Sequence, residues 1–386
     1  MLKIGIVANE PSGDLLGAGL IKEIRNRCPE VSFEGVGGPL MEAQGCRSLF
    51  LMERLSVMGL AEVLKHLPEL LSIRRQLVAH FKANPPDLFI GVDAPDFNLG
   101  LERALKSIAI PTVHYVSPTV WAWRPKRVKK IRKAVDLMLS IFPFEVEFLK
   151  QHHVPVSFVG HPLADEIPFE NSRIKARERL SVAREGQVIA LMPGSRMSEI
   201  NTLSELFLQT ARQCLIEQPG LRFLVPMVND KTHEAFADYW KTVAPELPLT
   251  LLKGGARDAM EAADVVLTAS GTATLEGMLL KRPMVVAYRL NRLTYWLVST
   301  FNMVKIPYVA MANLLAGEAL APEYIQDAAT PEALSSAVIS FLQSPKRVAL
   351  IEQRYATLHR EMRQGSDGKA ADAVLQLVHK GKCGES

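Results

Sequence analysis

Short apolar runs recur along this chain and alternate with longer segments of helical character. They are rich in Val, Ile and Leu and occupy 3–8, 31–36, 88–92, 112–116, 137–142, 156–159, 188–192, 222–226, 249–252, 265–268 and 284–288. Runs of this kind are typical of parallel strands that are buried on both faces and connected by helical crossovers. We therefore predict an α/β fold with two Rossmann-like halves.

The two series of predicted strands are separated by a polar stretch at 165–172, which contains Pro168. A chain of 386 residues is also longer than one hydrophobic core usually supports. We predict an N-terminal domain over 1–165, a second domain over 166–345 and helices over 346–386. The sequence does not decide whether these last helices return to the first domain or contact a partner subunit in a homodimer.

The composition removes several classes of function. The chain has 45 Lys and Arg against 41 Asp and Glu, and a net charge of +4 is too small to predict nucleic-acid binding. Its four cysteines match neither a zinc-ligand spacing nor a short disulfide framework, so we expect reduced thiols, no metal site and no cofactor. Signal-peptide features and a run of about 18 apolar residues are both missing, which predicts a cytoplasmic protein whose membrane contact is peripheral.

The strand predicted at 188–192 is followed by a tight turn with the sequence P-G-S-R, which contains Gly194, Ser195 and Arg196. Amides at the start of the next helix carry partial positive charge, and Gly194 lets the backbone approach a ligand closely. Arg196 can donate two parallel hydrogen bonds to a phosphate. Taken alone, this turn is equally consistent with a structural role.

A second turn of the same design follows the strand predicted at 265–268 and contains Ser270, Gly271 and Thr272. Its hydroxyls and amides suit a diphosphate, and Glu276, about one helical turn further on, is placed to accept ribose hydroxyls. Two such turns in one half predict a nucleotide-diphosphate site. The fingerprints G-x-G-x-x-G after the first strand and G-x-x-x-x-G-K-[ST] are both missing, so dehydrogenase and kinase functions lose their main support.

Four further motifs carry a family resemblance: A-N-E-P-S-G-D at 8–14, G-V-D-A-P-D-F-N at 91–98, H-Y-V-S-P-T-V-W-A-W at 114–123 and N-L-L-A-G at 313–317. With the two turns, they resemble the lipid-A-disaccharide synthases over essentially the whole chain. That resemblance implies a GT-B fold, in which an acceptor- and membrane-facing domain and a UDP-sugar donor domain face each other across a cleft. Asn9 stands where the family usually has glycine, and we expect it to keep the loop shape because Asn tolerates a left-handed backbone.

The resemblance implies transfer of 2,3-diacylglucosamine from UDP to the 6-hydroxyl of 2,3-diacylglucosamine 1-phosphate, with inversion to a β-1,6 disaccharide and release of UDP. It also implies that Asn313 contacts the diphosphate or the donor sugar. Such a transfer needs a carboxylate that takes the acceptor proton. Asp93, directly after a predicted strand, is our candidate for this base, and Asp96 in the same loop is its competitor. For one of the two aspartates we expect a structural role in bonding loop amides.

Other residues of these motifs have two possible roles each. Ser12 and Asp14 either contact the acceptor or cap the first helix. His114, Trp121 and Trp123 either line a sugar or acyl surface or pack in the core.

An apolar stripe at helical spacing follows the first two predicted strands and includes Leu60, Val63, Leu64, Leu67 and Leu71. We expect Pro68 to kink or split this helix. Such a stripe usually packs on a sheet, but substrates with two acyl chains favour membrane or acyl contact. The basic run over 124–133 would add attraction to an anionic membrane surface, on the inner face of the inner membrane.

Two other functions stay open. A UDP-sugar 2-epimerase shares the architecture and would isomerise the donor without an acceptor. A nucleotide-sugar-binding membrane module would bind without turnover. The sequence contexts of Asp93 and Arg196 favour the transferase over this module.

Overall fold

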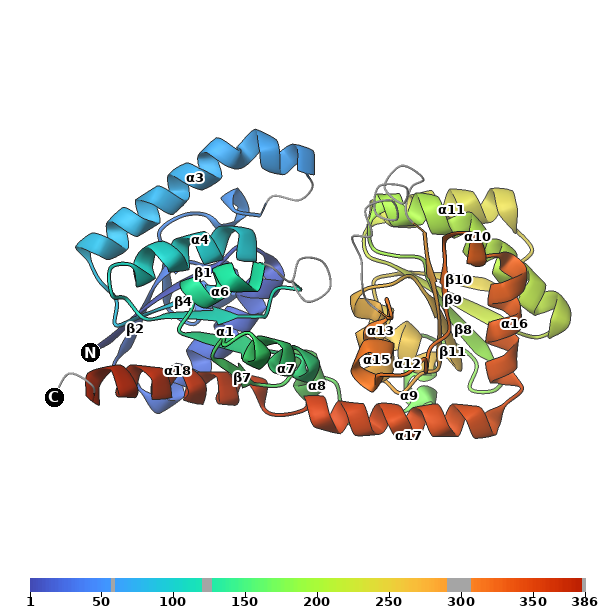
Figure 1. Cartoon of the computed structure of the whole chain (residues 1–386). Coiled ribbons are helices and arrows are strands. Elements are labelled where there is room, and N and C mark those ends of the chain that lie inside the picture. Colours follow the sequence, from blue (N-terminus) through green and yellow to red (C-terminus); the bar gives the residue numbers. More distant parts are fainter. Residues whose placement is uncertain (57–59, 120–126, 290–306, 384–386) are drawn as a thin grey trace. The chain divides into compact units, whose positions relative to one another are not determined.

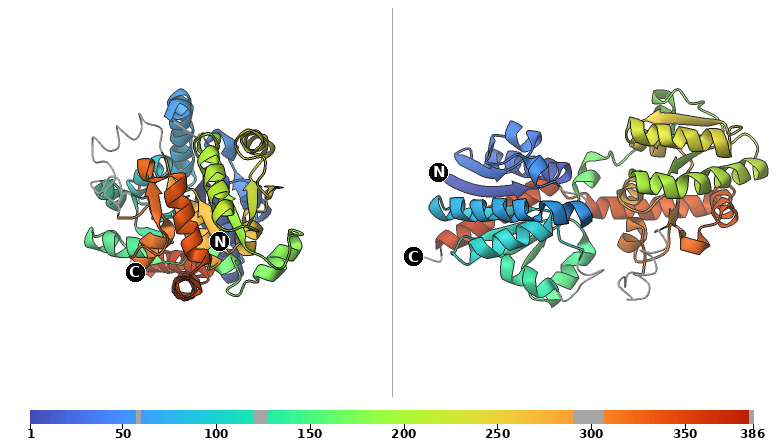
Figure 2. Two further views of the ribbon diagram at one scale, coloured as in Figure 1. Left: turned by 90° about the vertical axis from the view of Figure 1, so that its right-hand side faces the viewer. Right: turned by 90° about the horizontal axis from the view of Figure 1, so that it is seen from above.

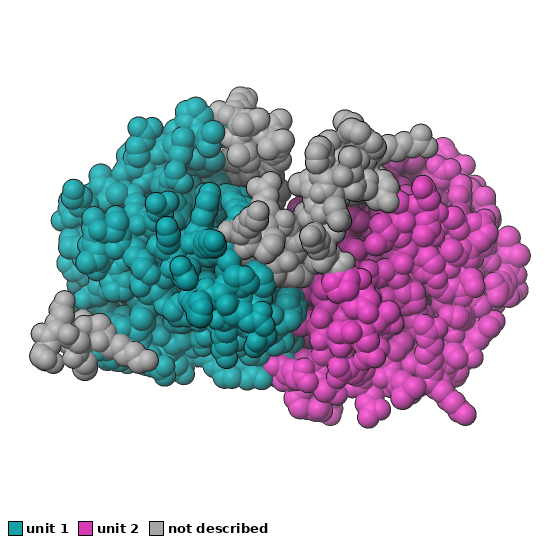
Figure 3. Space-filling model, viewed as in Figure 1, with its two compact units in different colours: residues 1–165, 362–386 teal, residues 166–361 magenta. Residues whose placement is uncertain are grey.

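The computed structural model describes residues 1–56, 60–119, 127–289 and 307–383, without the side chains of 60–65 and 380–383. The chain divides into two compact units (Figure 3): unit 1 comprises Met1–Asp165 with Met362–Ser386, and unit 2 comprises Glu166–Glu361. Each unit contains one sheet of parallel strands (Figure 1), which confirms the predicted α/β fold of two Rossmann-like halves.

Unit 1 contains a seven-stranded sheet with the order β3-β2-β1-β4-β5-β6-β7. Its strands are β1 (Leu2–Ala8), β2 (Val31–Val36), β3 (Cys46–Ser48), β4 (Leu88–Val92), β5 (Thr112–Tyr115), β6 (Leu137–Ser140) and β7 (Val156–Phe158). Its helices are α1 (Pro11–Arg27), α2 (Pro39–Ala43), the short η1 (Met52–Arg54), α3 (Leu60–Ala83), α4 (Pro95–Lys106), α6 (Val128–Ala134), α7 (Pro143–Gln151), α8 (Pro162–Glu166), which reaches the unit boundary, and α18 (Ser366–Cys383).

Two apolar clusters cover the two faces of this sheet, as expected where strands are buried on both sides. One face of β4 presents Ile90 to a cluster that includes Ile21 of α1 and Val374 of α18. The other face presents Phe89 to a cluster that includes Leu77 of α3 and residues of α4. This double burial explains why the strands are read from the sequence as continuous apolar runs.

Unit 2 contains a six-stranded sheet with the order β10-β9-β8-β11-β12-β13. Its strands are β8 (Val188–Met192), β9 (Arg222–Met227), β10 (Leu249–Lys253), β11 (Val265–Thr268), β12 (Met284–Tyr288) and β13 (Glu323–Ile325). Its helices are α9 (Arg173–Arg179), α10 (Met197–Glu217), α11 (Asp230–Val243), α12 (Ala256–Ala262), α13 (Thr272–Leu279), α15 (Met311–Ala316), the short η3 (Gln326–Ala328), α16 (Pro331–Leu342) and α17 (Pro345–Met362). Helix α10 packs with α11 and α16, and α12 packs with α9 and α13 (Figure 2).

The last helix of the chain belongs to unit 1. Helix α18 packs against α1, and Arg27 of α1 pairs with Asp372 of α18 at 2.7 Å. The carboxylate of Asp165 accepts hydrogen bonds from the amides of Gly365 and Ser366, at 2.8 and 2.6 Å, and so caps the start of α18. The helices predicted over 346–386 therefore belong to different units: α17 lies almost entirely within unit 2, and α18 lies within unit 1.

Candidate active site

The strand order reverses at one point in each sheet, between β1 and β4 in unit 1 and between β8 and β11 in unit 2. Loops that leave such a pair of strands diverge, so a ligand-binding crevice forms beyond the carboxyl ends of the strands. The loop after β4 begins at Asp93, and the loops after β8 and β11 are the two predicted anion-binding turns. In both units, the predicted polar loops therefore lie where sheets of this kind bind ligands.

Asp93 adopts a strained backbone conformation at the end of β4. Its φ is 52° and that of Ala94 is 43°, in the left-handed region that residues with a Cβ seldom occupy. The amide of Asp93 donates a hydrogen bond of 2.8 Å to the carbonyl of Tyr115, which ties the loop to β5. The side chain is partly exposed, and its carboxylate accepts no hydrogen bond from any residue that the structure describes. No described side chain or amide therefore competes with a ligand for this carboxylate.

Asn98 of α4 supports this loop. Its side chain is fully buried, and its amide nitrogen donates to the carbonyl oxygens of Asp93 at 2.8 Å, Val92 at 3.2 Å and Val7 at 3.4 Å. These carbonyls belong to the ends of β4 and β1, on both sides of the point where the strand order reverses. Asn98 ends the motif G-V-D-A-P-D-F-N at 91–98, but the sequence predicted no role for it, because its position in the chain does not reveal which carbonyls it meets.

His114 and Glu102 form a buried pair between β5 and α4. His114 Nδ1 lies 2.7 Å from Glu102 Oε1, and neither side chain is exposed. Burial raises the pKa of Glu102, and His114 opposes that shift. The possible role of His114 in acceptor contact is therefore not supported, since no surface of this side chain reaches solvent. Gly91 is required here, because a Cβ on it would lie 2.1 Å from Glu102 Oε1.

Asp14 caps a helix other than its own. Its carboxylate accepts hydrogen bonds from the amides of Gly38, Leu40 and Met41 at 2.9 to 3.0 Å, at the start of α2. The side chain is buried, so capping explains it better than acceptor contact. Ser12 is exposed in the first turn of α1 and stays a candidate for the acceptor.

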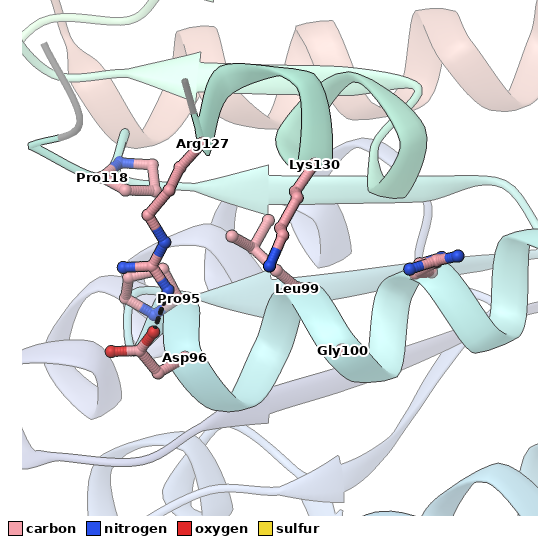
Figure 4. A pocket seen from close by; sticks show the side chains of 8 residues that line it. Pro95, Asp96, Leu99, Gly100, Pro118, Arg127 and Lys130 are labelled. Atoms are coloured by element: carbon pink, nitrogen blue, oxygen red, sulfur yellow. Dashed lines mark hydrogen bonds and ion pairs between the residues drawn. The ribbon is translucent and has the colours of Figure 1, made fainter. Parts of the chain in front are cut away.

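Asp96 lies in the first turn of α4, and its side chain is 82% exposed. Its carboxylate forms an ion pair with Arg127 at the start of α6 (Figure 4). It bonds none of the described loop amides, so the loop-stabilising role that we expected for one of the two aspartates belongs to Asn98 instead.

A cavity of about 540 Å³ opens at the corresponding end of the sheet in unit 2. It brings together seven of the predicted donor-site residues: Gly194, Ser195, Arg196, Ser270, Gly271, Thr272 and Glu276. The loops after β8 and β11 supply five of them, Thr272 and Glu276 come from α13, and the starts of α10 and α12 contribute to the wall. The size and the polar lining suit a nucleotide diphosphate.

One detail of the first turn differs from the prediction. The amides of Ser195 and Arg196 donate to Oε2 of Glu199, at 2.8 and 3.1 Å, so they do not point freely at a ligand. Gly194 has a φ of 125°, and a Cβ on it would lie 2.4 Å from the same oxygen. Glu199 thus shapes this turn, and the exposed guanidinium of Arg196 is the donor that the turn offers to a phosphate.

The second turn keeps its amides open. Gly271 precedes α13 with a φ of 114°, and no side chain in the described ranges caps this helix start. Thr272 is exposed beside it. The partial positive charge of the α13 terminus is therefore available to an anion in the cavity.

Glu276 is partly buried behind the same turn, and its burial raises the pKa of the carboxyl, while Arg257 opposes that shift.

The loop after β10 also lines the cavity, and the sequence did not predict this contribution. Gly254 and Gly255 follow β10 with φ values of 73° and 70°, and a Cβ on either would meet nothing within 4 Å. The glycine pair after a predicted strand was the signal that could have revealed this loop.

Asn313 does not line this cavity. It is fully buried, and its amide donates to Ala321 O at 2.7 Å and to Glu323 Oε1 at 2.8 Å. Its Oδ1 accepts from the amide of Ala321 at 2.8 Å. These bonds use the side chain within unit 2, so the implied contact of Asn313 with the donor is not supported.

The apolar stripe lies on α3, which continues through Pro68 without a break. The side chains of Leu60, Val63 and Leu64 lie outside the described residues. Leu67 is 41% exposed, and Leu71 is partly exposed.

Leu67 and Leu71, with Leu70 of α3 and Phe97 of α4, line an apolar groove of about 260 Å³. The buried Asn9 also lines this groove. Its φ is not positive, so Asn9 does not adopt the left-handed backbone conformation that we expected.

The predictions about the tryptophans and the basic run, about a metal site and about a membrane-spanning helix can be compared only with the residues that the structure describes. Trp121, Trp123 and the first residues of the basic run, 124–126, fall outside them. Among described side chains, no group of three or more His, Cys, Asp or Glu could hold a metal ion. None of the helices in the described ranges has the length and apolar character needed to cross a membrane.

Comparison with known proteins identifies close relatives. The family described as lipid-A-disaccharide synthetase matches residues 4–378. The chain is 53% identical over 379 residues to the lipid-A-disaccharide synthase of Pseudomonas paraeruginosa, covering 98% of this chain and 99% of that one. It is 52% identical over 376 residues to the lipid-A-disaccharide synthase of Alkalilimnicola ehrlichii, covering 97% and 98%.

Solved structures with a similar fold are more distant in sequence. The calicheamicin glycosyltransferase aligns with a TM-score of 0.61 at 16% identity, over 98% of this chain and 99% of that one. The UDP-GlcNAc 2-epimerase from Neisseria meningitidis bound to UDP-GlcNAc aligns with a TM-score of 0.60 at 11% identity, over 98% and 100%. At these identities the likeness supports the fold alone.

Proposed function

Because this chain belongs to the lipid-A-disaccharide synthase family, we propose a course for the sugar transfer that it catalyses. The enzyme is a glycosyltransferase that forms the lipid A disaccharide. Its donor is UDP-2,3-diacylglucosamine and its acceptor is 2,3-diacylglucosamine 1-phosphate. The 6-hydroxyl of the acceptor attacks the anomeric carbon, UDP leaves, and the product is the β-1,6-linked disaccharide 1-phosphate.

The observation that carries this course is the partly exposed carboxylate of Asp93, which lies at the point where the strand order of unit 1 reverses. Inverting transfer needs a base that removes the proton of the attacking hydroxyl as the anomeric centre gains positive charge. Asp93 is partly exposed, is unbonded to described residues and is held by Asn98, so it can meet a hydroxyl without reorganising its loop. We assign the base to Asp93.

The cavity of unit 2 holds the UDP part of the donor. Arg196 and the open start of α13 face the diphosphate, whose negative charge grows as the bond to the sugar breaks. Glu276 accepts hydrogen bonds from the ribose hydroxyls. Since protein groups supply this positive charge, we expect disaccharide formation to continue in EDTA. Loss of activity in EDTA with recovery in Mg²⁺ would contradict that expectation.

The lipid tails of both substrates place the enzyme at a membrane surface. Exposed leucines on α3, such as Leu67, and cations on α6, such as Lys133, suit peripheral contact with an anionic bilayer on its cytoplasmic side.

The test is direct. Purified protein is incubated with both substrates, and UDP and disaccharide 1-phosphate are detected by mass spectrometry, with Asp93→Asn as the inactive control. Isomerisation of the donor sugar without an acceptor would support a 2-epimerase instead. Binding of UDP-sugar without any product would support a non-catalytic module.

A further inference from the structure

A basic pocket lies between α4 and α6, next to the loop that carries Asp93 (Figure 4). Its volume is about 210 Å³, and its wall includes Leu99, Gly100, Arg103, Arg127, Lys130 and Asp96. In Figure 4 the side chains of Arg127 and Lys130 extend from α6 toward α4. Packing of α4 against α6 holds the two sources of positive charge together.

Within the described ranges, the positive charges that line this pocket outnumber the negative ones. Three cations, Arg103, Arg127 and Lys130, face one carboxylate, Asp96. Only Arg127 pairs with it. The side chains of Arg103 and Lys130 are exposed and make no hydrogen bond or ion pair with any residue in the described ranges. A pocket with this excess of positive charge suits an anion with two negative charges, such as a phosphomonoester.

The pocket is also close to the proposed base along the chain. Pro95 and Asp96, which line it, follow Asp93 by two and three residues. Arg103 lies eight residues beyond Pro95, or about 12 Å along the axis of α4. Arg103 and Pro95 thus lie at the two ends of the stretch of α4 that lines the pocket.

A second feature restricts the ligand further. Pro95 and Asp96 line the apolar groove of Leu67, Leu70 and Leu71 as well as the basic pocket. A cationic site and an apolar site therefore share one wall at the start of α4. One molecule that carries both a phosphate and acyl chains can occupy both.

We propose that Arg103, Arg127 and Lys130 bind the 1-phosphate of the lipid acceptor and thereby present its 6-hydroxyl to Asp93. The assignment rests on the proposed function. C1, which carries the phosphate, and C5, which carries the 6-hydroxymethyl group, flank the ring oxygen, so a phosphate held between α4 and α6 keeps the 6-hydroxyl within one sugar ring of that site and near the start of α4. When the phosphate binds, Arg127 leaves its ion pair with Asp96 and pairs with the phosphate. Arg103 and Lys130, which have no partner among the described residues, pair with the phosphate as well.

The same cations would also attract the headgroups of anionic membrane lipids, so the test has to separate the two sources of phosphate. The test variant is the double substitution Arg103→Gln and Lys130→Gln. Its matched control is Lys129→Gln with Arg132→Gln, which removes the same charge from exposed positions of α6 that do not line the pocket. Each protein is assayed with the phosphorylated acceptor and with 2,3-diacylglucosamine that lacks the phosphate.

We expect the test variant to raise the KM for the phosphorylated acceptor on the order of 10- to 100-fold, with kcat and the KM for the UDP-sugar near wild type. The acceptor without phosphate should have a high KM in every protein, including the test variant. If the test variant raises the KM for both acceptors equally, the proposal is overturned. If the control raises the KM for the phosphorylated acceptor as much as the test variant does, the proposal is also overturned, and membrane attraction explains the effect of the cations.

Binding of glucosamine 1-phosphate, a soluble head group without acyl chains, provides a readout that does not depend on turnover. Titration calorimetry should detect binding to wild type and to the control, and weaker binding to the test variant. An inactive wild type that still binds this probe through Arg103 and Lys130 would contradict the proposed function but keep the phosphate site. Identical binding to all three proteins would refute the site alone.

Discussion

The side-chain amide of Asn98 donates a 2.8 Å hydrogen bond to the carbonyl oxygen of Asp93, the residue that we assign as the catalytic base. Asp93 and Ala94 both have positive φ, a conformation that costs on the order of 1 kcal/mol or more for residues with a Cβ. The buried amide of Asn98 holds this conformation by bonding three carbonyls of β1 and β4 at once. Asn98 is thus a positioning residue for the base.

Asn98→Ala should lower kcat by roughly 10- to 100-fold, because a base displaced by about 1 Å loses the alignment of attack. The KM for the UDP-sugar should stay within a few-fold of wild type, since the donor cavity belongs to unit 2. Steady-state kinetics give both values.

The control for this prediction is Leu105→Ala, a buried position on the same helix that does not contact the loop carbonyls. It should reduce the free energy of unfolding by about 2–5 kcal/mol and leave kcat almost unchanged in the folded protein. If both variants lose stability and neither loses kcat, Asn98 has only a structural role.

Much of the fold could be predicted because its strands are parallel and buried on both faces. Such strands appear as continuous apolar runs, as 88–92 does for β4. The strands that were missed, β3 and β13, each have three residues and lie at sheet edges, where burial is incomplete. Loops that follow long buried strands could also be located, so Asp93 and the turn of Arg196 were found.

Side-chain partners could not be predicted in the same way, because they depend on residues distant in the chain. Asp14 was expected either to contact the acceptor or to cap the first helix, yet it caps α2, more than twenty residues further on. His114 and Asn313 belong to motifs that suggest a site, yet both are completely buried with internal partners. Buried polar residues with internal hydrogen bonds of this kind stabilise the shape of the loops around them.

Arg196→Ala should reduce kcat/KM by about tenfold to a hundredfold. Glu199 already accepts the amides of Ser195 and Arg196, so the guanidinium is the main donor of this turn, and a charge-assisted hydrogen bond is worth about 1.5–3 kcal/mol. UDP binding, measured by calorimetry, should weaken by a similar factor. The control is Arg222→Ala, which should behave as wild type. Arg222 is exposed and starts β9, whereas the cavity is lined by the last residues of this strand. Unchanged UDP binding in folded Arg196→Ala would remove Arg196 from the site.

The combined substitution Leu67→Ser and Leu71→Ser should weaken binding to vesicles of anionic phospholipid by at least tenfold, because each buried leucine contributes about 1.5–3 kcal/mol. Co-sedimentation measures the bound fraction. Ile216→Ser, which changes a 75% exposed side chain in unit 2, should leave vesicle binding unchanged. A double variant that melts at a much lower temperature but binds vesicles normally while folded would show that the leucines are part of the core.

Asp367→Asn should stabilise the protein at alkaline pH. Burial, reinforced by Asp165, raises the pKa of Asp367 from 3.8 to about 6 in the folded state. The folded protein therefore binds more protons than the unfolded chain between about pH 4 and pH 6, and stability from this group falls as the pH rises through that range. The variant should melt at a higher temperature than wild type at pH 8, and the two should converge near pH 4.

Asp372→Asn on the same helix is the control for this pH dependence. Asp372 pairs with Arg27 at 2.7 Å, so its removal should not raise the melting temperature at pH 8. Equal melting temperatures of wild type and Asp367→Asn at both pH values would show that Asp367 ionises without cost in the folded protein.

The assignment of the base is tested by comparing Asp93→Asn with Asp96→Asn. Asn is nearly isosteric with Asp but cannot take up a proton at neutral pH. Asp93→Asn should therefore lower kcat by roughly 10²- to 10⁴-fold, while UDP binding to the cavity of unit 2 stays normal. Asp96 is 82% exposed and, of the residues that the structure describes, pairs with Arg127 alone, so Asp96→Asn should keep kcat within a few-fold. A folded and active Asp93→Asn enzyme beside a folded but inactive Asp96→Asn enzyme would transfer the role of base to Asp96, whose side chain would then have to leave Arg127 to reach the acceptor.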